Sequence, residues 1–421
     1  MAEQFTFVEA ETAITDIKEI IRWQAWVKTQ VRIGIELEKA GNAPLYILER
    51  ELEPSHSYGI LSRYNVVNIT HDGSVNGDGN EILVCGTIEP FIIALEKMEE
   101  LHKILRGHRL KADASCGMHY HILAAQNSFM PEVILKNFYQ LFRFYYAGLL
   151  YLTSTGTASS RTSDISRGST QYFSSAHVGI TPVGRTMSSV KARINGQSGR
   201  YSAFNMGDEL GGRHDLMRFN GENQVVDFHV ELRFPDASDA PAQIVAQMFM
   251  FRAMLLKAIE LSKFGVITAR ADETPSTRQV ADRLVNGTVQ PSDLEYAKDQ
   301  AQRLLTLIRP NLLTIDGSSA KILGEMIRHP VWKLRKGGVS WADINNGLLP
   351  RERVVKDIAQ VVLKTIVLQQ VTGAKTAQLW KGQAATFLGL PENEIRNGLI
   401  QLGHQVKLGF DLEAGTYYVE W

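Results

Sequence analysis

Three short segments of the chain alternate apolar and ionisable residues, and this alternation constrains the fold more than any other feature. Successive side chains of a β-strand point to opposite faces, so such a segment can bury one face and present ionisable groups on the other. The pattern predicts three strands, over residues 31–37, 118–123 and about 225–234. The first of them leads directly into Glu38. Each predicted strand carries two ionisable residues two positions apart.

Glu36 and Glu38 are the first of these pairs, in the segment RIGIELEK. They share one strand face, while Ile33, Ile35 and Leu37 face the other way. Two adjacent carboxylates repel and raise each other's pKa unless a cation lies between them, and Mg²⁺ or Mn²⁺ prefers such hard oxygen ligands. The pair therefore predicts a metal site, and the alternative is a polar strand face exposed to water.

His119 and His121 alternate in the same way in the second segment, and Glu231 and Arg233 do so in the third. Two imidazoles on one face can bind a metal or contact phosphate, or they can be structural, hydrogen-bonded histidines. A carboxylate beside a guanidinium suits a metal-bound triphosphate, because the first can hold the cation while the second bonds a phosphate. The alternative for this last pair is an intrastrand salt bridge.

Helical spacing of apolar residues predicts helices around these strands, and the mixture predicts an α+β fold. The expected helices cover residues 15–30, 88–105, 131–153 and 241–263. Residues 153–212 are rich in Ser, Thr, Gly and Arg and predict a long loop, either a solvated excursion or a lid over an anionic ligand. Its arginines are Arg161, Arg167, Arg185, Arg193 and Arg200.

Residues 271–421 are predicted to be mostly helical. Ser292 and Glu295 form a capping-box pattern that opens a helix to about Arg309, and further helices are expected over 317–328 and 351–372. The end of the chain, about 376–421, has the outline of a winged-helix module with a hairpin turning near Ala414. Its second helix carries only Arg396 as a base, which favours packing against protein over nucleic-acid binding.

Charge and hydropathy exclude several classes of protein. Lys plus Arg equals Asp plus Glu at 45 each, so no overall field attracts nucleic acid or an acidic membrane. No segment approaches the roughly 18 apolar residues of a membrane span, and the first residues are acidic where a secretory segment would be basic. We expect a cytoplasmic protein, with Cys85 and Cys116 as buried small hydrophobes.

The order of these motifs resembles glutamine synthetase and its shorter relatives, the amidoligases of the carboxylate–amine ligase superfamily. Glu-x-Glu at Glu36 is followed by GMHYH at 117–121 and by ELRFPDASDAP at 231–241, where Asp239-Ala240-Pro241 replaces the usual Ala-Asn-Pro. The amidoligase branch is similar in having a D-x-S, a following Glu, a CG-x-H-x-H and an R-Y-x-x-x-N. These match Asp72, Glu81, Cys116 to His121, and Arg200 to Asn205.

The resemblance implies a glutamine synthetase-like catalytic domain over residues 1–270, with an antiparallel sheet and packed helices. It implies ATP and Mg²⁺ or Mn²⁺ as cofactors and assigns a role to each matching residue. Glu36, His119 and Glu231 would hold the nucleotide-side metal, and Glu38 and Glu81 would hold the substrate-side metal. His121 and Arg233 would contact the ATP phosphates, and Arg200 would stabilise the transferred phosphoryl group. Asp72 would serve the substrate-side metal or orient the amine.

The implied reaction joins a carboxylate to an amine through an acyl phosphate, under a closing loop. Only about 30 residues precede Glu36, too few for the synthetase's amino-terminal small domain, so we expect an amino acid, peptide or other carboxylate as substrate. A homo-oligomer remains open, as does the role of the carboxy-terminal region. The alternatives are a phosphotransferase or hydrolase on the same fold, and an inactive ligase-like binding or assembly protein.

Overall fold

The computed structural model describes most of the chain up to residue 348. The described residues are 5–8, 10–56, 62–77, 79–86, 89–124, 127–155, 203–205, 218–219, 224–271, 279–280, 283–284 and 289–348, with three short strands near the C-terminus. Most of the predicted loop 153–212 and the predicted helix 351–372 lie outside these residues, so both stay predictions.

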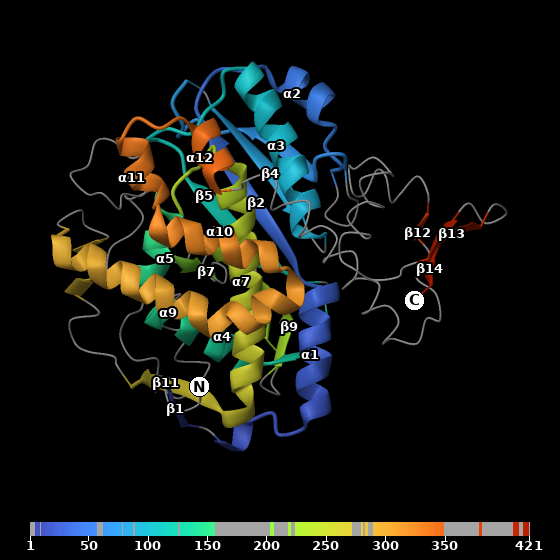
Figure 1. Ribbon diagram of the computed structural model, residues 1–421, viewed down its shortest axis with the longest axis vertical. Coiled ribbons are helices and arrows are strands. Elements are labelled where there is room, and N and C mark those ends of the chain that lie inside the picture. The colour runs from blue at the N-terminus through green and yellow to red at the C-terminus, as the bar shows by residue number, and fades with distance from the viewer. Residues whose placement is uncertain are drawn as a thin grey trace.

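A six-stranded sheet forms the middle of the molecule, in the order β3-β4-β2-β5-β10-β7 (Figure 1). All neighbouring strands in it are antiparallel. The strands are β2 (Arg32–Lys39), β3 (Val66–His71), β4 (Asn80–Gly86), β5 (Met118–Leu123), β7 (Phe204–Asn205) and β10 (His229–Leu232). The predicted α+β class with an antiparallel sheet is therefore confirmed, and β2 extends two residues beyond the predicted strand.

One face of this sheet is the hydrophobic core. Ile33, Ile35 and Leu37 of β2 are buried on it, as the alternation predicted. Tyr120 of β5 lies on the same face, where its ring is 5.1 Å from that of Phe251 and its hydroxyl donates to Gln247. Because the strand period is two, the ionisable residues of β2 and β5 must point to the opposite face.

Helix α7 (Pro241–Leu261) packs at the centre of the helical layer (Figure 1). Every residue of α7 except Glu260 is buried, because other helices surround it. The helices in contact with α7 are α1 (Ile17–Thr29), α3 (Phe91–Gly107), α4 (Glu132–Phe144), α9 (Pro291–Ile315), α10 (Gly317–Arg328) and α12 (Trp341–Leu348). Other described helices are α2 (Leu45–Leu52), α5 (Tyr146–Thr153) and α11 (Val331–Lys336), with the short 3-10 helices η2 (Ala10–Thr12) and η6 (Ser262–Phe264).

The prediction of one helix over 131–153 is wrong, because α4 ends at Phe144 and α5 begins at Tyr146. The Phe144 carbonyl accepts a hydrogen bond from Arg270 Nη1 at 2.9 Å, and the Arg270 guanidinium lies over the Tyr145 ring. A carbonyl diverted to a side chain interrupts the hydrogen-bond ladder of a helix, and a kink follows.

The predicted strand 225–234 is also two strands, which belong to different sheets. Strand β9 (Gln224–Asp227) pairs with β6 (Met130–Pro131) and β8 (Arg218–Phe219), whereas β10 joins the six-stranded sheet. Phe228 separates them: its ring is buried against Trp26 and its carbonyl accepts from the Ala124 amide. Because Phe228, whose ring is buried, stands between the two strands in the chain, the pairing of β9 with β6 and β8 ends before it. A further two-stranded sheet joins β1 (Phe5–Val8) to β11 (Val266–Arg270).

Helix α9 differs from its prediction at both ends. It begins at Pro291, and the capping box joins Gln290 to Asp293 where Ser292 and Glu295 were expected. It also continues through Pro310 to Ile315. Proline removes one backbone hydrogen bond, and burial of the apolar side chains on either side, Ile308 and Leu312, offsets that loss. Helix α10 confirms the predicted helix 317–328.

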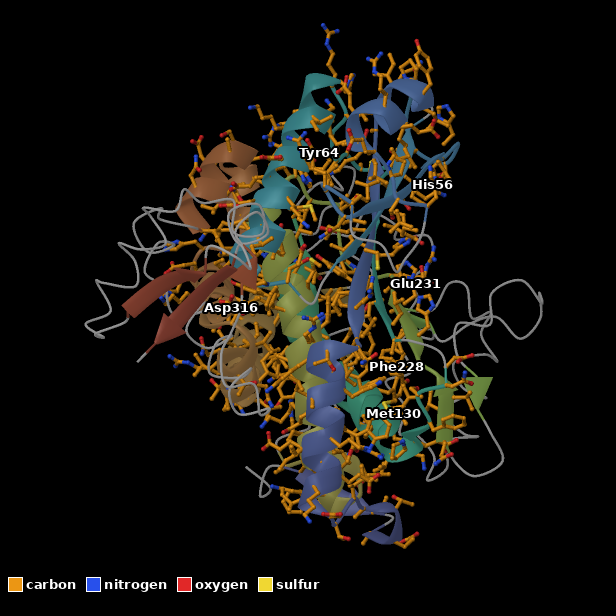
Figure 2. The ribbon with its side chains drawn as sticks, turned by 90° about the vertical axis from the view of Figure 1, so that its right-hand side faces the viewer. His56, Tyr64, Met130, Phe228, Glu231 and Asp316 are labelled. Carbon is orange, nitrogen blue, oxygen red and sulfur yellow. The ribbon has the colours of Figure 1, made fainter. Side chains whose placement is uncertain are left out.

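Residues 289–348 pack on the region predicted as the catalytic domain. Asp316, labelled in Figure 2, accepts from the Ser318 amide at the start of α10 and from the Phe91 amide at the start of α3. Asn345 of α12 accepts from the Ala242 amide at the start of α7. These contacts join the two regions, and the boundary near residue 271 stays a prediction.

Three strands are described near the C-terminus: β12 (Leu379–Trp380), β13 (Lys407–Asp411) and β14 (Thr416–Glu420). Strands β13 and β14 pair antiparallel, and the expected turn at Ala414 lies outside the described residues. The helices of the predicted winged-helix module lie outside the described residues. Among the helices that are described, none is long and apolar enough to cross a membrane.

Candidate metal centre

The strand register brings six ionisable residues onto the face of the sheet opposite the core. Across β2 and β5, Glu36 lies opposite His119 and Gly34 opposite His121. Across the outer neighbours, Glu81 of β4 lies opposite Glu38, and Glu231 of β10 lies opposite His121. Residues far apart in the sequence thus become neighbours because the four strands are aligned.

Glu36, His119 and Glu231 form the first cluster. Each offers one ligand atom within 4.8 Å of the others. His119 Nδ1 is 2.7 Å from a Glu36 carboxylate oxygen and 3.5 Å from one of Glu231. His119 and Glu231 are buried, and Figure 2 labels Glu231 on its strand beside Phe228. Two carboxylates and one imidazole are a donor set that Mn²⁺ and Mg²⁺ accept.

Glu38, Asp72 and Glu81 form the second cluster, whose ligand atoms are also within 4.8 Å of one another. Asp72 comes from the turn after β3, where it accepts hydrogen bonds from the backbone amide and the hydroxyl of Ser74. This is the local Asx turn that favours Asp at such a position. The cluster contains carboxylates only, the ligand type that Mg²⁺ and Ca²⁺ prefer.

The two clusters adjoin each other through His119, Glu38 and Gly117. His119 Nε2 is 3.9 Å from a Glu38 oxygen, and the Gly117 amide donates to the other Glu38 oxygen. A Cβ on residue 117 would stand 3.2 Å from His119 Nε2 and 3.3 Å from Glu38. Glycine is therefore the residue that lets the backbone approach both side chains, which explains the glycine before the two histidines.

The electrostatics of the carboxylates differ between the clusters. Burial raises the pKa of Glu81 to about 7, and the charges of Glu36 and Glu38 raise it too. Burial also raises the pKa of Glu38. Burial opposes ionisation of Glu36 as well, but hydrogen bonds with His119 and His121 outweigh it and hold that pKa well below its usual range. The charge of His119 opposes both increases without outweighing burial, so Glu38 and Glu81 have less compensating positive charge than Glu36.

A divalent cation fits both clusters. His119 Nε2 is buried and has no hydrogen-bond partner in the described part of the chain, and Glu38 and Glu81 of the second cluster carry raised pKa values. A cation would relieve that repulsion. The residues that would hold it are those of the two clusters, Asp72 included.

His121 and Arg233 lie beside the first cluster. His121 Nε2 is 2.9 Å from a Glu36 oxygen. Arg233 forms an ion pair with Glu231 through Nη1, and its buried Nε has no partner among the described residues. A guanidinium with donors to spare beside a metal cluster can bond a phosphate.

His229 is a site residue that the sequence analysis missed. Its Nε2 is 2.9 Å from His121 Nδ1, so His121 is held between Glu36 and His229. Burial, together with the charge of His121, lowers the pKa of His229 to about 4. The spacing could have indicated it, because residues 229, 231 and 233 alternate onto the face that carries Glu231.

Arg200 lies outside the described residues, so its proposed role stays a prediction. The end of its motif is described: Asn205 of β7 pairs with Glu231 of β10, and the Arg233 amide donates to the Ala203 carbonyl. The R-Y-x-x-x-N segment therefore ends at the edge of the sheet next to the first cluster.

No protein-family model matches the chain, and no curated protein matches it. Several solved structures are similar at low identity, and three of them are as follows. A GmaS–ADP complex matches with a TM-score of 0.40 and 14% identity over 77% of this chain and 74% of that chain. A bifunctional glutathione synthetase from Pasteurella multocida matches with a TM-score of 0.40 and 11% identity, over 85% of this chain and 57% of that one.

The third is the complex between the prokaryotic ubiquitin-like protein Pup and its ligase PafA, with a TM-score of 0.34 and 14% identity over 96% of this chain and 87% of that chain. Likeness at this level carries no conclusion about function. The family that the motifs resemble therefore stays a prediction, and the function has to be inferred from the site residues.

Proposed function

We propose that the protein is an ATP-dependent carboxylate–amine ligase that forms an amide or isopeptide bond through an acyl phosphate. One observation carries the proposal: two acidic clusters adjoin on one sheet face, with Arg233 and His121 beside the first. The motif order, which resembles that of the amidoligases, is independent support. A triphosphate and a carboxylate can react only where their charges are neutralised together, and this face supplies the ligands for it.

In this proposal Glu36, His119 and Glu231 hold the cation that binds the nucleotide. Glu38, Glu81 and Asp72 hold the cation nearer the acid and the amine. Cations bound by these residues would screen the negative charge of the reacting oxygens. Arg233 and His121 bond the phosphates of ATP, and Arg200 stabilises the transferred phosphoryl group.

The reaction has two balanced steps. An oxygen of the substrate carboxylate attacks the γ-phosphorus, the bond from that phosphorus to the β,γ-bridging oxygen breaks, and ADP leaves. The amine nitrogen then attacks the acyl carbon, phosphate leaves with the transferred oxygen, and the amine loses a proton. Positioning and charge neutralisation are the protein's main contributions to such a transfer. The acyl phosphate also has to be kept from water, which is the role proposed for residues 153–212.

The convergence of the carboxylates argues against an inactive binding protein. Five glutamates and aspartates with their ligand atoms this close together repel one another. Without a cation to bind, such repulsion is a stability cost that substitution would remove. A phosphotransferase would use the same cations, so the reaction class has to be tested directly.

The test is ATP consumption by the full chain with Mg²⁺, a pool of amino acids and small carboxylates, and ammonia or hydroxylamine. The readouts are ADP and hydroxamate, and Glu36→Ala is the control. Hydroxamate that forms with the wild type and not with the control supports the ligase and identifies its acid. A stable phosphorylated product in the absence of any amine would identify a kinase, and turnover without nucleotide would identify a hydrolase.

A further inference from the structure

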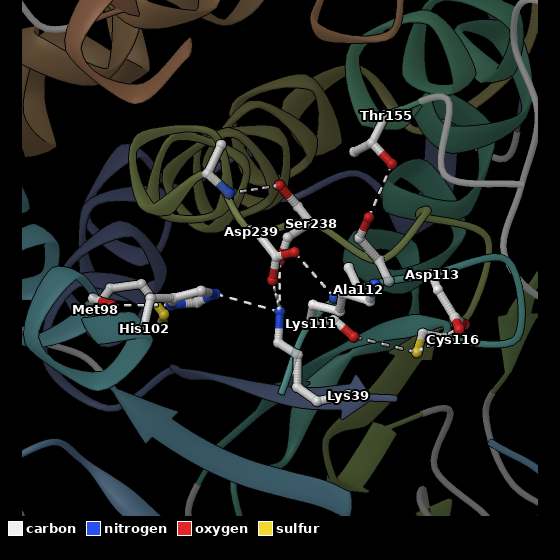
Figure 3. A network of polar contacts seen from close by, with 12 residues as sticks. Lys39, Met98, His102, Lys111, Ala112, Asp113, Cys116, Thr155, Ser238 and Asp239 are labelled. Carbon is white, nitrogen blue, oxygen red and sulfur yellow. Dashed lines mark hydrogen bonds and ion pairs between the residues drawn. The ribbon is translucent and has the colours of Figure 1, made fainter. Parts of the chain in front are cut away.

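Lys39 is the residue after Glu38 on β2, and its side chain points to the core face (Figure 3). It is 1% exposed, and all three of its ammonium hydrogens have an acceptor. Nζ lies 2.7 Å from Asp239 Oδ1, 2.7 Å from the Ser238 carbonyl and 3.3 Å from His102 Nε2. The ammonium therefore ties β2 to the segment before α7 and to α3.

His102 is neutral in this arrangement, and its tautomer is fixed. Its Nδ1 is 2.9 Å from the Met98 carbonyl, which can only accept, so Nδ1 carries the hydrogen and Nε2 accepts from Lys39. Burial, with the Lys39 charge beside it, lowers the pKa of His102 to about 3, which agrees with this assignment. The network thus contains one cation, Lys39, and one anion, Asp239.

Asp239 also forms a hydrogen bond with the segment that precedes Gly117. Its Oδ2 accepts from the Ala112 amide at 2.9 Å (Figure 3). The preceding residue, Lys111, exchanges two backbone hydrogen bonds with Ala40 of the chain just after β2. Gly117 itself forms an isolated bridge with Asp236. The segment 111–117 is therefore held at both ends by residues that flank Lys39 and Asp239.

Gly117 is the residue whose amide donates to Glu38. The ion pair is connected to this carboxylate in two ways. Lys39 directly follows Glu38 on β2. Asp239 also accepts from the Ala112 amide, and Ala112 belongs to the segment that ends at Gly117. We propose that the Lys39–Asp239 ion pair is a positioning device for Glu38, required for cation binding at the Glu38–Asp72–Glu81 cluster and not at the Glu36–His119–Glu231 cluster. This inference rests on the proposed function of the two clusters.

A buried ion pair is weak support for stability alone. Taking two charges out of water costs free energy, and apolar residues of similar volume often replace such a pair without loss. What an apolar pair cannot supply is the directed acceptor that Asp239 offers to the Ala112 amide. Stability and cation binding should therefore separate when the pair is replaced.

The experiment compares two double variants that both remove the ion pair. Lys39→Met with Asp239→Asn keeps an acceptor for the Ala112 amide, whereas Lys39→Met with Asp239→Leu removes it. The control is Lys257→Met with Glu260→Gln, which removes another buried lysine and its partner at the far end of α7. The probe is Mn²⁺ alone, titrated by calorimetry, and circular dichroism checks that each variant is folded.

Single variants assign the two binding events. Glu81→Gln should abolish the event at the second cluster and Glu231→Gln the event at the first. We expect the Lys39→Met, Asp239→Leu variant (Met/Leu) to lose affinity for Mn²⁺ only at the site that Glu81→Gln abolishes. The expected loss is about 10–100-fold, the usual effect of losing a residue that orients a metal ligand. The Lys39→Met, Asp239→Asn variant (Met/Asn) should lose less Mn²⁺ affinity at this site, and the control should bind Mn²⁺ as the wild type does.

Unchanged affinity of a folded Met/Leu variant at the second cluster would overturn the inference and leave the proposed function standing. Equal losses at both clusters would overturn it too, because they indicate a general structural effect. If the wild type binds no Mn²⁺ at either cluster, the proposed function itself fails, and that result differs from the other two.

Discussion

Glu36 and His119 lie opposite each other on β2 and β5, with His119 Nδ1 2.7 Å from a Glu36 carboxylate oxygen. The contact depends on the register of two central strands, since a slip of one residue would turn one of these side chains into the core. Glu231 of β10 completes the cluster from the other side. The site is therefore built on the rigid centre of the sheet.

Replacing Glu81 by Gln should stabilise the cation-free protein and reduce its response to Mn²⁺. Burial is the main cause of the raised pKa of Glu81, and repulsion from Glu36 and Glu38 adds to it. The amide of Gln removes both the cost of burying a charge and the repulsion. A cation at 100 times its dissociation constant adds about 2.7 kcal/mol to the free energy of unfolding. Thermal unfolding with and without Mn²⁺ measures both effects, and the exposed Glu295→Gln serves as the control. If Mn²⁺ stabilises the Glu81→Gln variant as much as the wild type, the second cluster is not a cation site.

Replacing Gly117 by Ala should weaken cation binding by about tenfold with little loss of stability. The added methyl group would stand 3.2 Å from His119 Nε2 and 3.3 Å from Glu38, so both ligands must move. Gly107→Ala is the matched control, because a methyl group there meets no atom within 4 Å, and helix propensity predicts a gain of roughly 0.5–1 kcal/mol. Equal Mn²⁺ affinity of the two variants in calorimetry would be evidence against this geometry.

Replacing His229 by Leu should weaken Mn²⁺ binding at the first cluster by about 10–100-fold. Without the 2.9 Å contact to His229 Nε2, the ring of His121 loses one of the two partners that fix its orientation beside Glu36. Calorimetry measures the affinity, and the exposed His329→Leu is the control. The role of His229 is refuted if both variants bind Mn²⁺ as tightly as the wild type.

The stabilising effect of Asp239 should disappear in acid. Burial alone would raise its pKa, but the charge of Lys39 and the hydrogen bonds from Lys39 and Ala112 outweigh this and lower it. A carboxyl whose pKa is lower in the folded state stabilises the protein above its unfolded pKa, about 3.9. That contribution is lost as the pH falls below this value toward the folded pKa.

Asp239→Asn imitates the protonated carboxyl and tests this directly. We expect it to cost about 3–5 kcal/mol at pH 7, because Lys39 is left without its buried partner. The cost should shrink when chemical denaturation is repeated near pH 3. Asp299→Asn, at a half-exposed pair with Arg303, should cost less than about 1 kcal/mol at either pH. A cost for Asp239→Asn that does not change with pH would contradict the lowered pKa.

Alternation of residue types predicted the strands of the site and the faces that their side chains share. Glu36, Glu38, His119 and His121 occupy the expected face because a period of two leaves little freedom once Ile33, Ile35 and Leu37 are buried. Strand order and register were not readable in the same way, since pairing depends on contacts between residues distant in sequence. The division of residues 224–232 between two sheets is an example.

The buried polar residues were harder to predict. Lys39 has the same parity as Ile35 and Leu37, so its position indicates the core face, but its partners His102 and Asp239 are about 60 and 200 residues away in sequence. Asp239 entered the sequence analysis only as a departure from the family pattern. The structure accounts for that departure, because Asp239 is the counter-ion of Lys39.

The most direct test of the central claim is a calorimetric titration of the full chain with Mn²⁺, followed by ATP in the presence and absence of the cation. The account predicts two Mn²⁺ ions per chain, one lost in Glu231→Gln and the other in Glu81→Gln, and ATP binding that requires Mn²⁺ and fails in Glu36→Ala. A wild-type protein that binds neither Mn²⁺ nor ATP would contradict it.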